Sequence, residues 1–253
     1  MNKFEEKIKK LAETYGKNPD EFINVLENSS GVLQEKKGDL FLEIGGILYN
    51  LSFFKLILTV LDRALKYFID SKDKPGELSC YGNLGIAHYH LGDFRKAIEY
   101  YERALEINKE VGNKILESRS YGNLGNAYDS LGNSNKAIEY HKRALGIDRE
   151  IGDRSGEASC YANLGVDHFN LGDFRKAIEY QKKALGIDRE IGDRSGESTC
   201  YTNLGIAYHK LGDLNKAVEY YKKALEIAIE ISDRSGEASC YAKWSVANFS
   251  INP

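Results

Sequence analysis

The chain has 253 residues and a mass of 28.5 kDa, with 42% hydrophobic and 29% charged residues, a composition that can bury a core. Its 35 lysines and arginines nearly balance its 38 aspartates and glutamates, so a polybasic surface for nucleic acid or anionic lipid is not expected. No apolar run approaches the ~18 residues of a membrane-spanning helix, and the polar start is unlike a signal peptide. We therefore expect a cytoplasmic protein with no nucleic-acid partner and no membrane partner.

Residues 1–40 differ in pattern from the rest of the chain. A charged amphipathic segment comes first, and a second one begins at Pro19. The apolar side chains recur at spacings of three and four, which is typical of helices; they are Phe4, Ile8 and Leu11, then Phe22, Val25 and Leu26. We expect two short helices that form an N-terminal cap.

From residue 41 onward the chain repeats itself every 40 residues. The segment Tyr-Gly-Asn-Leu-Gly at 81–85 and 121–125 returns as Tyr-Ala-Asn-Leu-Gly at 161–165 and Tyr-Thr-Asn-Leu-Gly at 201–205, and a more divergent copy precedes them. A fixed period of this length is typical of repeat proteins. The predicted units are 41–80, 81–120, 121–160, 161–200 and 201–240, and 241–253 is a capping helix or a truncated sixth unit.

Each unit is predicted to hold two helices separated by short breaks. Gly152 and Gly172 suit the left-handed residue that ends a helix, and the aspartates that follow them, Asp153 and Asp173, can cap the next helix. The spacing predicts helices over about 154–170 and 174–191. No strand is expected, so the chain should be all-α.

The cysteines and histidines follow the same repeat. Cys80, Cys160, Cys200 and Cys240 lie at multiples of 40 residues, so we expect small buried side chains and no disulfide framework or metal site. None of the five histidines has a metal-ligand spacing, and His88 and His168 occupy a position that holds tyrosine in other units. We therefore expect no catalytic residue, no metal and no cofactor.

The spacing of the repeated residues is similar to that of the tetratricopeptide repeat, over residues 41–253. In one unit the residues that carry the resemblance are Tyr81, Leu84, Gly85, Gly92, Phe94, Ala97, Tyr101 and Ala104. The period of 40 exceeds the usual ~34 and resembles the long repeats of Pins-type G-protein signalling modulators, kinesin light chains and Rap-type regulators. The resemblance implies a right-handed superhelical solenoid of antiparallel helix pairs that acts as a non-catalytic scaffold for other proteins.

The family geometry also implies that the first helix of each pair forms the concave wall. Asn83, Asn123, Asn163 and Asn203 then make an asparagine ladder along this wall. An amide side chain both donates and accepts, so the ladder could bind the backbone of an extended peptide. The alternative is that these asparagines satisfy neighbouring helix ends and recur because the units were duplicated.

Other residues on the implied wall break the repeat identity, and we expect them to set specificity. They are Tyr89, Arg119, Asn126, Asp129, Phe169, His209 and Lys210. The clamp by which related co-chaperone domains hold a C-terminal carboxylate begins with lysine, but the matching column holds Gly82, Gly122, Ala162 and Thr202. A chaperone-tail receptor is therefore not expected.

The last predicted helix has an apolar face with no second helix after it in the sequence. Trp244, Val246, Phe249 and Ile251 form this face, and an uncovered apolar patch often marks an interface. We expect either a cap with a partly exposed Trp244 or a homo-oligomer that forms through Trp244 and Phe249. The main prediction is a scaffold that binds a peptide segment or helix of a partner; the alternatives are a peptide-responsive regulator of the Rap type and a self-associating structural module.

Overall fold

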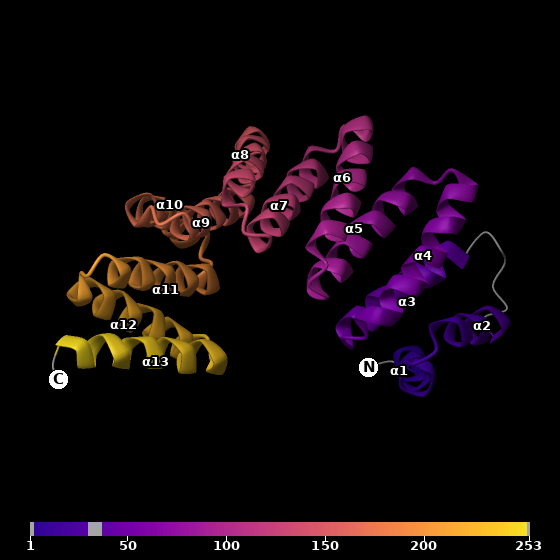
Figure 1. The fold of residues 1–253 in the computed structure, drawn as a ribbon, viewed down its shortest axis with the longest axis horizontal. Coiled ribbons are helices and arrows are strands. Elements are labelled where there is room, and N and C mark those ends of the chain that lie inside the picture. Colours follow the sequence, from indigo (N-terminus) through magenta and orange to yellow (C-terminus); the bar gives the residue numbers. More distant parts are fainter. Residues whose placement is uncertain (1–2, 30–36, 252–253) are drawn as a thin grey trace. The chain divides into compact units, whose positions relative to one another are not determined.

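The computed structural model describes residues 3–29 and 37–251 and shows an all-α chain over those ranges (Figure 1). The helices are α1 (Lys3–Tyr15), α2 (Pro19–Ser29), α3 (Lys37–Asn50), α4 (Phe54–Ser71), α5 (Lys74–His90), α6 (Phe94–Val111), α7 (Lys114–Ser130), α8 (Ser134–Ile151), α9 (Arg154–Asn170), α10 (Phe174–Ile191), α11 (Arg194–Lys210), α12 (Leu214–Glu230) and α13 (Arg234–Ile251). The helices predicted over 154–170 and 174–191 coincide with α9 and α10. The predicted all-α fold of successive helix pairs is confirmed.

The predicted 40-residue units differ in phase from the helix pairs. The pairs occupy 37–71, 74–111, 154–191 and 194–230, with α7 and α8 between them. Each predicted unit therefore begins several residues inside a first helix. The most recognisable sequence segment, Tyr-x-Asn-Leu-Gly, lies in the middle of the first helix and therefore does not mark where a pair begins.

Local sequence explains where the helices begin and end. Gly152 ends α8 with a φ of 73°, and the Asp153 side chain accepts a hydrogen bond from the Gly156 backbone N–H at 2.9 Å to start α9. Lys72 and Ser232 hold the same left-handed backbone at the positions where other pairs have glycine, with φ of 58° and 59°. The break between two helices is thus kept without glycine, although the left-handed backbone is energetically unfavourable for a residue with a Cβ atom.

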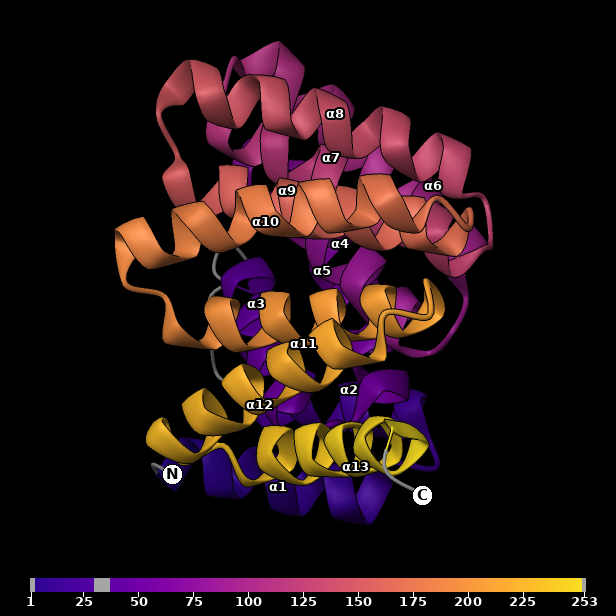
Figure 2. The same cartoon turned by 90° about the vertical axis from the view of Figure 1, so that its left-hand side faces the viewer.

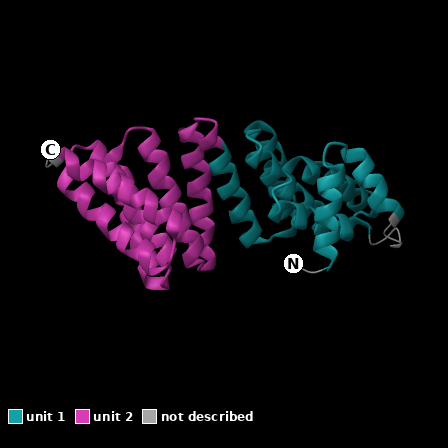
Figure 3. Cartoon of the chain, turned by 90° about the horizontal axis from the view of Figure 1, so that it is seen from below, with its two compact units in different colours: residues 1–127 teal, residues 128–253 magenta. Residues whose placement is uncertain are grey.

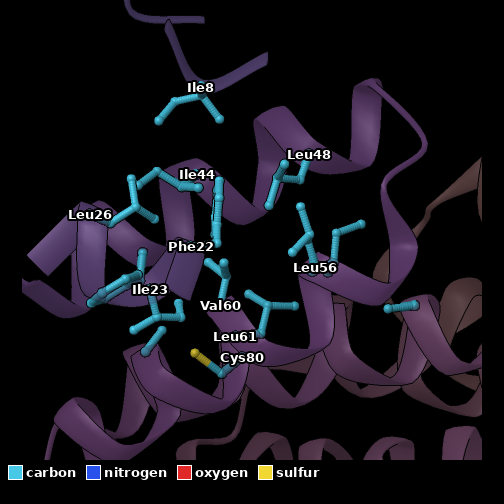
Figure 4. Close-up of a cluster of buried hydrophobic side chains, with 14 of the residues drawn as sticks. Ile8, Phe22, Ile23, Leu26, Ile44, Leu48, Leu56, Val60, Leu61 and Cys80 are labelled. Atoms are coloured by element: carbon cyan, nitrogen blue, oxygen red, sulfur yellow. The ribbon is translucent and has the colours of Figure 1, made fainter. Parts of the chain in front are cut away.

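The chain divides into two compact units, residues 1–127 and 128–253, with the boundary near the end of α7 (Figure 3). In the N-terminal unit α1 packs against α3, and α2 packs against α4. Their buried side chains, among them Ile8, Phe22 and Ile23, enter one core with Ile44 and Val60 (Figure 4). The predicted helices of segment 1–40 thus cover the first helix pair, and residues 30–36 of that segment lie outside the described residues.

The C-terminal unit holds α8 to α13, and α11, α12 and α13 lie side by side in both views (Figures 1 and 2). Ala217 and Tyr221 of α12 and Ala247 of α13 form a buried cluster, against which Trp244 packs while partly exposed. Phe249 is 71% exposed. No helix among the described residues is long and apolar enough to cross a membrane.

Candidate functional site

The four residues of the asparagine ladder lie at the same place on four first helices. Asn83 is on α5 and Asn123 on α7 in the N-terminal unit, and Asn163 is on α9 and Asn203 on α11 in the C-terminal unit. Asn83 is exposed and the other three are half-buried. Within the described residues none of these four amides makes a side-chain hydrogen bond. They therefore do not satisfy neighbouring helix ends in this structure.

The Leu-Gly pair that follows each asparagine brings the first helix close to the second. A Cβ atom on Gly85 would lie 2.4 Å from Cε1 of Tyr101, and one on Gly205 would lie 2.6 Å from Cδ1 of Tyr221. These distances are shorter than carbon contacts allow. The glycine is therefore required for the ring of the second helix to lie under the first, and this packing directs the preceding asparagine outward.

The specificity candidates of the N-terminal unit are Tyr89, Arg119 and Asn126. Tyr89 is half-buried and packs against Phe94, with ring centroids 5.3 Å apart. Arg119 is exposed at the start of α7, and Asn126 is half-buried further along the same helix.

The specificity candidates of the C-terminal unit differ in their surroundings. Asp129 accepts hydrogen bonds from Asn170 Nδ2 at 2.9 Å and from Ser134 Oγ at 3.2 Å, so its carboxylate links the end of α7 to α9. His209 and Lys210 are exposed at the end of α11. Phe169 lies with Asn203 in the wall of one pocket. The structure thus brings Phe169 and Asn203 together and gives Asp129 bonds within the protein.

Two features of this unit were missed by the sequence reasoning. Gln181 of α10 lines the same pocket as Phe169. His141 Nδ1 of α8 lies 2.7 Å from Asp167 Oδ2 of α9, and each residue is only 1% exposed. Both could have been found by comparing repeats, because Gln181 stands where other pairs carry Tyr101 or Tyr221 and Asp167 stands in a column of alanines.

The histidines predicted to share a core position with tyrosine do so. His88 stacks on Tyr100 with ring centroids 5.3 Å apart, and His168 stacks on Tyr180 at 5.2 Å. At the equivalent position Tyr208 stacks on Tyr220 at 5.4 Å. Burial lowers the pKa of both His88 and His168, so the folded chain favours neutral rings that act in packing.

The four cysteines are buried, as predicted, and two of them are also hydrogen-bond donors. Cys160 Sγ donates to Asp148 at 3.2 Å, and Cys200 Sγ donates to Asp188 at 3.3 Å. Burial, followed by the neighbouring carboxylate, raises the pKa of both thiols, which makes them poor nucleophiles. The described residues contain no group of histidine, cysteine and carboxylate side chains that could hold a metal ion.

The family profile that matches this chain is the tetratricopeptide repeat, over residues 38–110, 88–150 and 157–230. The chain belongs to the tetratricopeptide repeat family. These matches include the ladder positions 83, 123, 163 and 203, so the columns described above are those of tetratricopeptide first helices.

Solved structures with the same fold include a signal transduction ATPase with a tetratricopeptide repeat sensor from Pyrococcus horikoshii. It has a TM-score of 0.76 and 20% identity, and the match covers 96% of this chain and 38% of that one. BtubC from P. vanneervenii has a TM-score of 0.70 and 21% identity, with 89% and 92% covered. A Rap protein complexed with competence and sporulation factor has a TM-score of 0.68 and 18% identity, with 90% and 69% covered. No curated protein matches the sequence. At these identities the similarity establishes the fold.

Proposed function

We propose that the chain is a non-catalytic scaffold that binds a peptide segment or helix of a partner protein on the surface of its first helices. The observation that carries the proposal is the asparagine ladder. Its amides recur once per repeat, are at least partly exposed and have no hydrogen-bond partner among the described residues. Such amides can pair with the N–H and C=O groups of an extended backbone, which are otherwise costly to desolvate.

The comparisons agree with a protein or peptide ligand. One similar structure is a Rap protein complexed with competence and sporulation factor. On this chain the partner would pair its backbone with the ladder. Tyr89, Arg119, Asn126, Phe169, His209 and Lys210 would contact its side chains, and Asp129 would contribute through its bond to Asn170. The site needs no cofactor, and we place the protein in the cytoplasm without a nucleic-acid or membrane partner.

The test is to capture partners from an extract of the native host and to quantify them by mass spectrometry. The double variant Asn123→Ala with Asn163→Ala removes two ladder amides. The matched control is Asn135→Ala with Asn215→Ala, two exposed asparagines at the start of second helices. We expect a partner that the wild type and the control retain and that the ladder variant binds about thirtyfold more weakly, since two backbone hydrogen bonds contribute ~1 kcal/mol each. Equal capture by all three proteins would remove the ladder from the mechanism.

A peptide-responsive regulator of the Rap type is the second candidate function. It is favoured by the same fold in the Rap complex. A regulator should change its compactness when the captured peptide binds, because stacked repeats can alter their pitch together. Small-angle scattering with and without that peptide measures this change, and an identical radius of gyration would exclude it.

A further inference from the structure

A pocket of about 100 Å³ opens among α9, α10 and α11 in the C-terminal unit. Two first helices form its sides, through Val166 and Phe169 of α9 and through Asn203 and Ile206 of α11. The second helix α10 forms its floor, through Ala177 and Gln181. The pocket therefore lies on the proposed binding surface, beside one amide of the asparagine ladder.

The pocket can be traced to one repeat position. In the C-terminal unit this position on the second helix carries His141, Gln181 and Tyr221, so residue 181 alone is not a ring. Tyr221 lies against Gly205, and Gln181 lies in the same way against Gly165. Because the glutamine side chain is shorter than tyrosine and has no ring, it leaves space that tyrosine would fill.

The two neighbouring positions are filled by the chain itself. His141 is bonded to Asp167, with both residues 1% exposed. Tyr221 is 2% exposed and packs with Ala217 and Ala247. The space beside Gln181 has no such occupant.

The glutamine is also held so that the pocket stays open. Gln181 Nε2 donates a hydrogen bond to the Ala162 carbonyl at 2.8 Å, which fixes the amide against α9. Its Oε1 is buried without a partner among the described residues. An apolar occupant would therefore remove no further hydration from that oxygen.

We propose that this pocket receives one aliphatic side chain, the size of valine to leucine or methionine, from the bound peptide. The inference rests on the proposed function and names a specificity element within it. An apolar cavity of ~150 Å³ holds benzene, so about 100 Å³ suits an aliphatic group and is too small for an indole. Charged groups are excluded because the lining offers no countercharge. The half-buried Asn203 amide in the pocket wall can bond the backbone of the residue that inserts.

The probe is acetyl-leucine-N-methylamide, which presents one leucine side chain between two peptide groups. It is titrated into the full chain, and binding is followed by NMR at the methyl groups of Val166 and Ile206. The comparison probes carry alanine, lysine or tryptophan in place of leucine. We expect the leucine probe to bind at least about tenfold more tightly than the alanine probe, because each added methylene in an apolar pocket raises affinity by that order.

Two variants tie the binding to the pocket. Gln181→Tyr installs the residue that other pairs carry, so it should fold, fill the pocket and abolish the preference for leucine. Ile206→Ala removes part of one wall and should weaken the leucine probe several-fold. Ile86→Ala, the same change at the equivalent position of α5, should not.

The proposal is overturned if the leucine and alanine probes bind equally, if the preference survives Gln181→Tyr, or if the lysine or tryptophan probe binds more tightly than leucine. Equal binding of all probes that is lost in Asn203→Ala would overturn the pocket and still support the ladder. The partner-capture experiment reads the amides at 123 and 163, so its outcome does not depend on this pocket.

Discussion

Two glycines of α5, three residues apart, stand in different surroundings. A Cβ atom on Gly85 would overlap the ring of Tyr101, whereas one on Gly82 would meet nothing within 4 Å. The first glycine is required by packing between helices. The second has no such reason, and alanine stands at the equivalent position 162.

This contrast gives a matched pair of substitutions in one helix. Gly85→Ala should lower the free energy of unfolding by about 1–3 kcal/mol, because the buried ring of Tyr101 must move. Gly82→Ala should raise it by about 0.5–1 kcal/mol, because alanine loses less backbone freedom in a helix. Urea denaturation measures both. A stabilising Gly85→Ala would show that the helices are not as close as described.

His168 should make stability depend on pH. Burial comes first among the causes that lower its pKa, with Lys176 and Lys142 acting in the same direction and Asp173 and Asp167 opposing them. The unfolded chain therefore binds a proton more readily than the folded one, and stability falls as pH drops below about 6.5. His88 behaves in the same way for the same main reason.

His168→Tyr should reduce this dependence and keep the ring stack, because Tyr208 and Tyr220 already form it at 5.4 Å. The free energy of unfolding, measured from about pH 7.5 to about pH 5.5, should fall less in the variant than in the wild type. The wild type, measured over the same pH range, is the reference for this comparison. An unaltered slope in His168→Tyr would mean that this ring does not titrate differently on folding.

Several helices of both kinds, first and second, begin at a single capping side chain. Asp153 caps α9, and Asn133 caps α8 through a bond from the Lys136 backbone N–H at 3.2 Å. An ion pair also joins two neighbouring helices: Arg149 Nε in the last turn of α8 lies 2.9 Å from Glu157 Oε1 in the first turn of α9. The Arg149 side chain is 55% exposed, although that of Glu157 is only 10% exposed, so solvent screens the pair, whereas the cap satisfies a backbone donor that has no helical partner.

Removing the cap of α9 should therefore cost more than altering its charge. Asp153→Ala should lower the free energy of unfolding by about 1 kcal/mol. Asp153→Asn should be nearly neutral, because asparagine already caps α8. Thermal and urea denaturation of the two variants against the wild type decide this. Equal losses in both variants would assign the effect to the charge of Asp153 and not to the cap.

At the scale of the whole molecule, α13 has an apolar face that no described helix covers. Three of its side chains are 58%, 59% and 71% exposed: Tyr241, Val246 and Phe249. Trp244 is partly exposed, as expected for a capping helix. Self-association through Trp244 and Phe249 remains a prediction.

If two copies pair through α13, the mass from light scattering should rise with concentration, and Phe249→Lys should abolish the rise. The substitution replaces an exposed ring with a charge, so the fold should be retained. A strict monomer at high concentration would exclude this interface. The ladder and the pocket would be unaffected, since they lie on other helices.

The sequence by itself determined the period, the helices and most of the helix ends. Gly152 and Asp153 act through their own backbone and the next three residues, so their effect can be read locally and was predicted correctly. The same holds for the buried position of His168, because the tyrosines of other repeats occupy that column. The starting residue of each unit is different, because a repeat period by itself does not show at which residue a helix pair begins.

The contacts between helices were decided by the tertiary structure. The sequence gives no distance between His141 and Asp167, which are 26 residues apart, or between Asp129 and Asn170, which are 41 residues apart. The pocket beside Gln181 exists because one side chain is too short to fill a space bounded by two other helices. Cavities and buried pairs depend on the volumes and polar groups of facing elements, and these become neighbours only when the repeats stack.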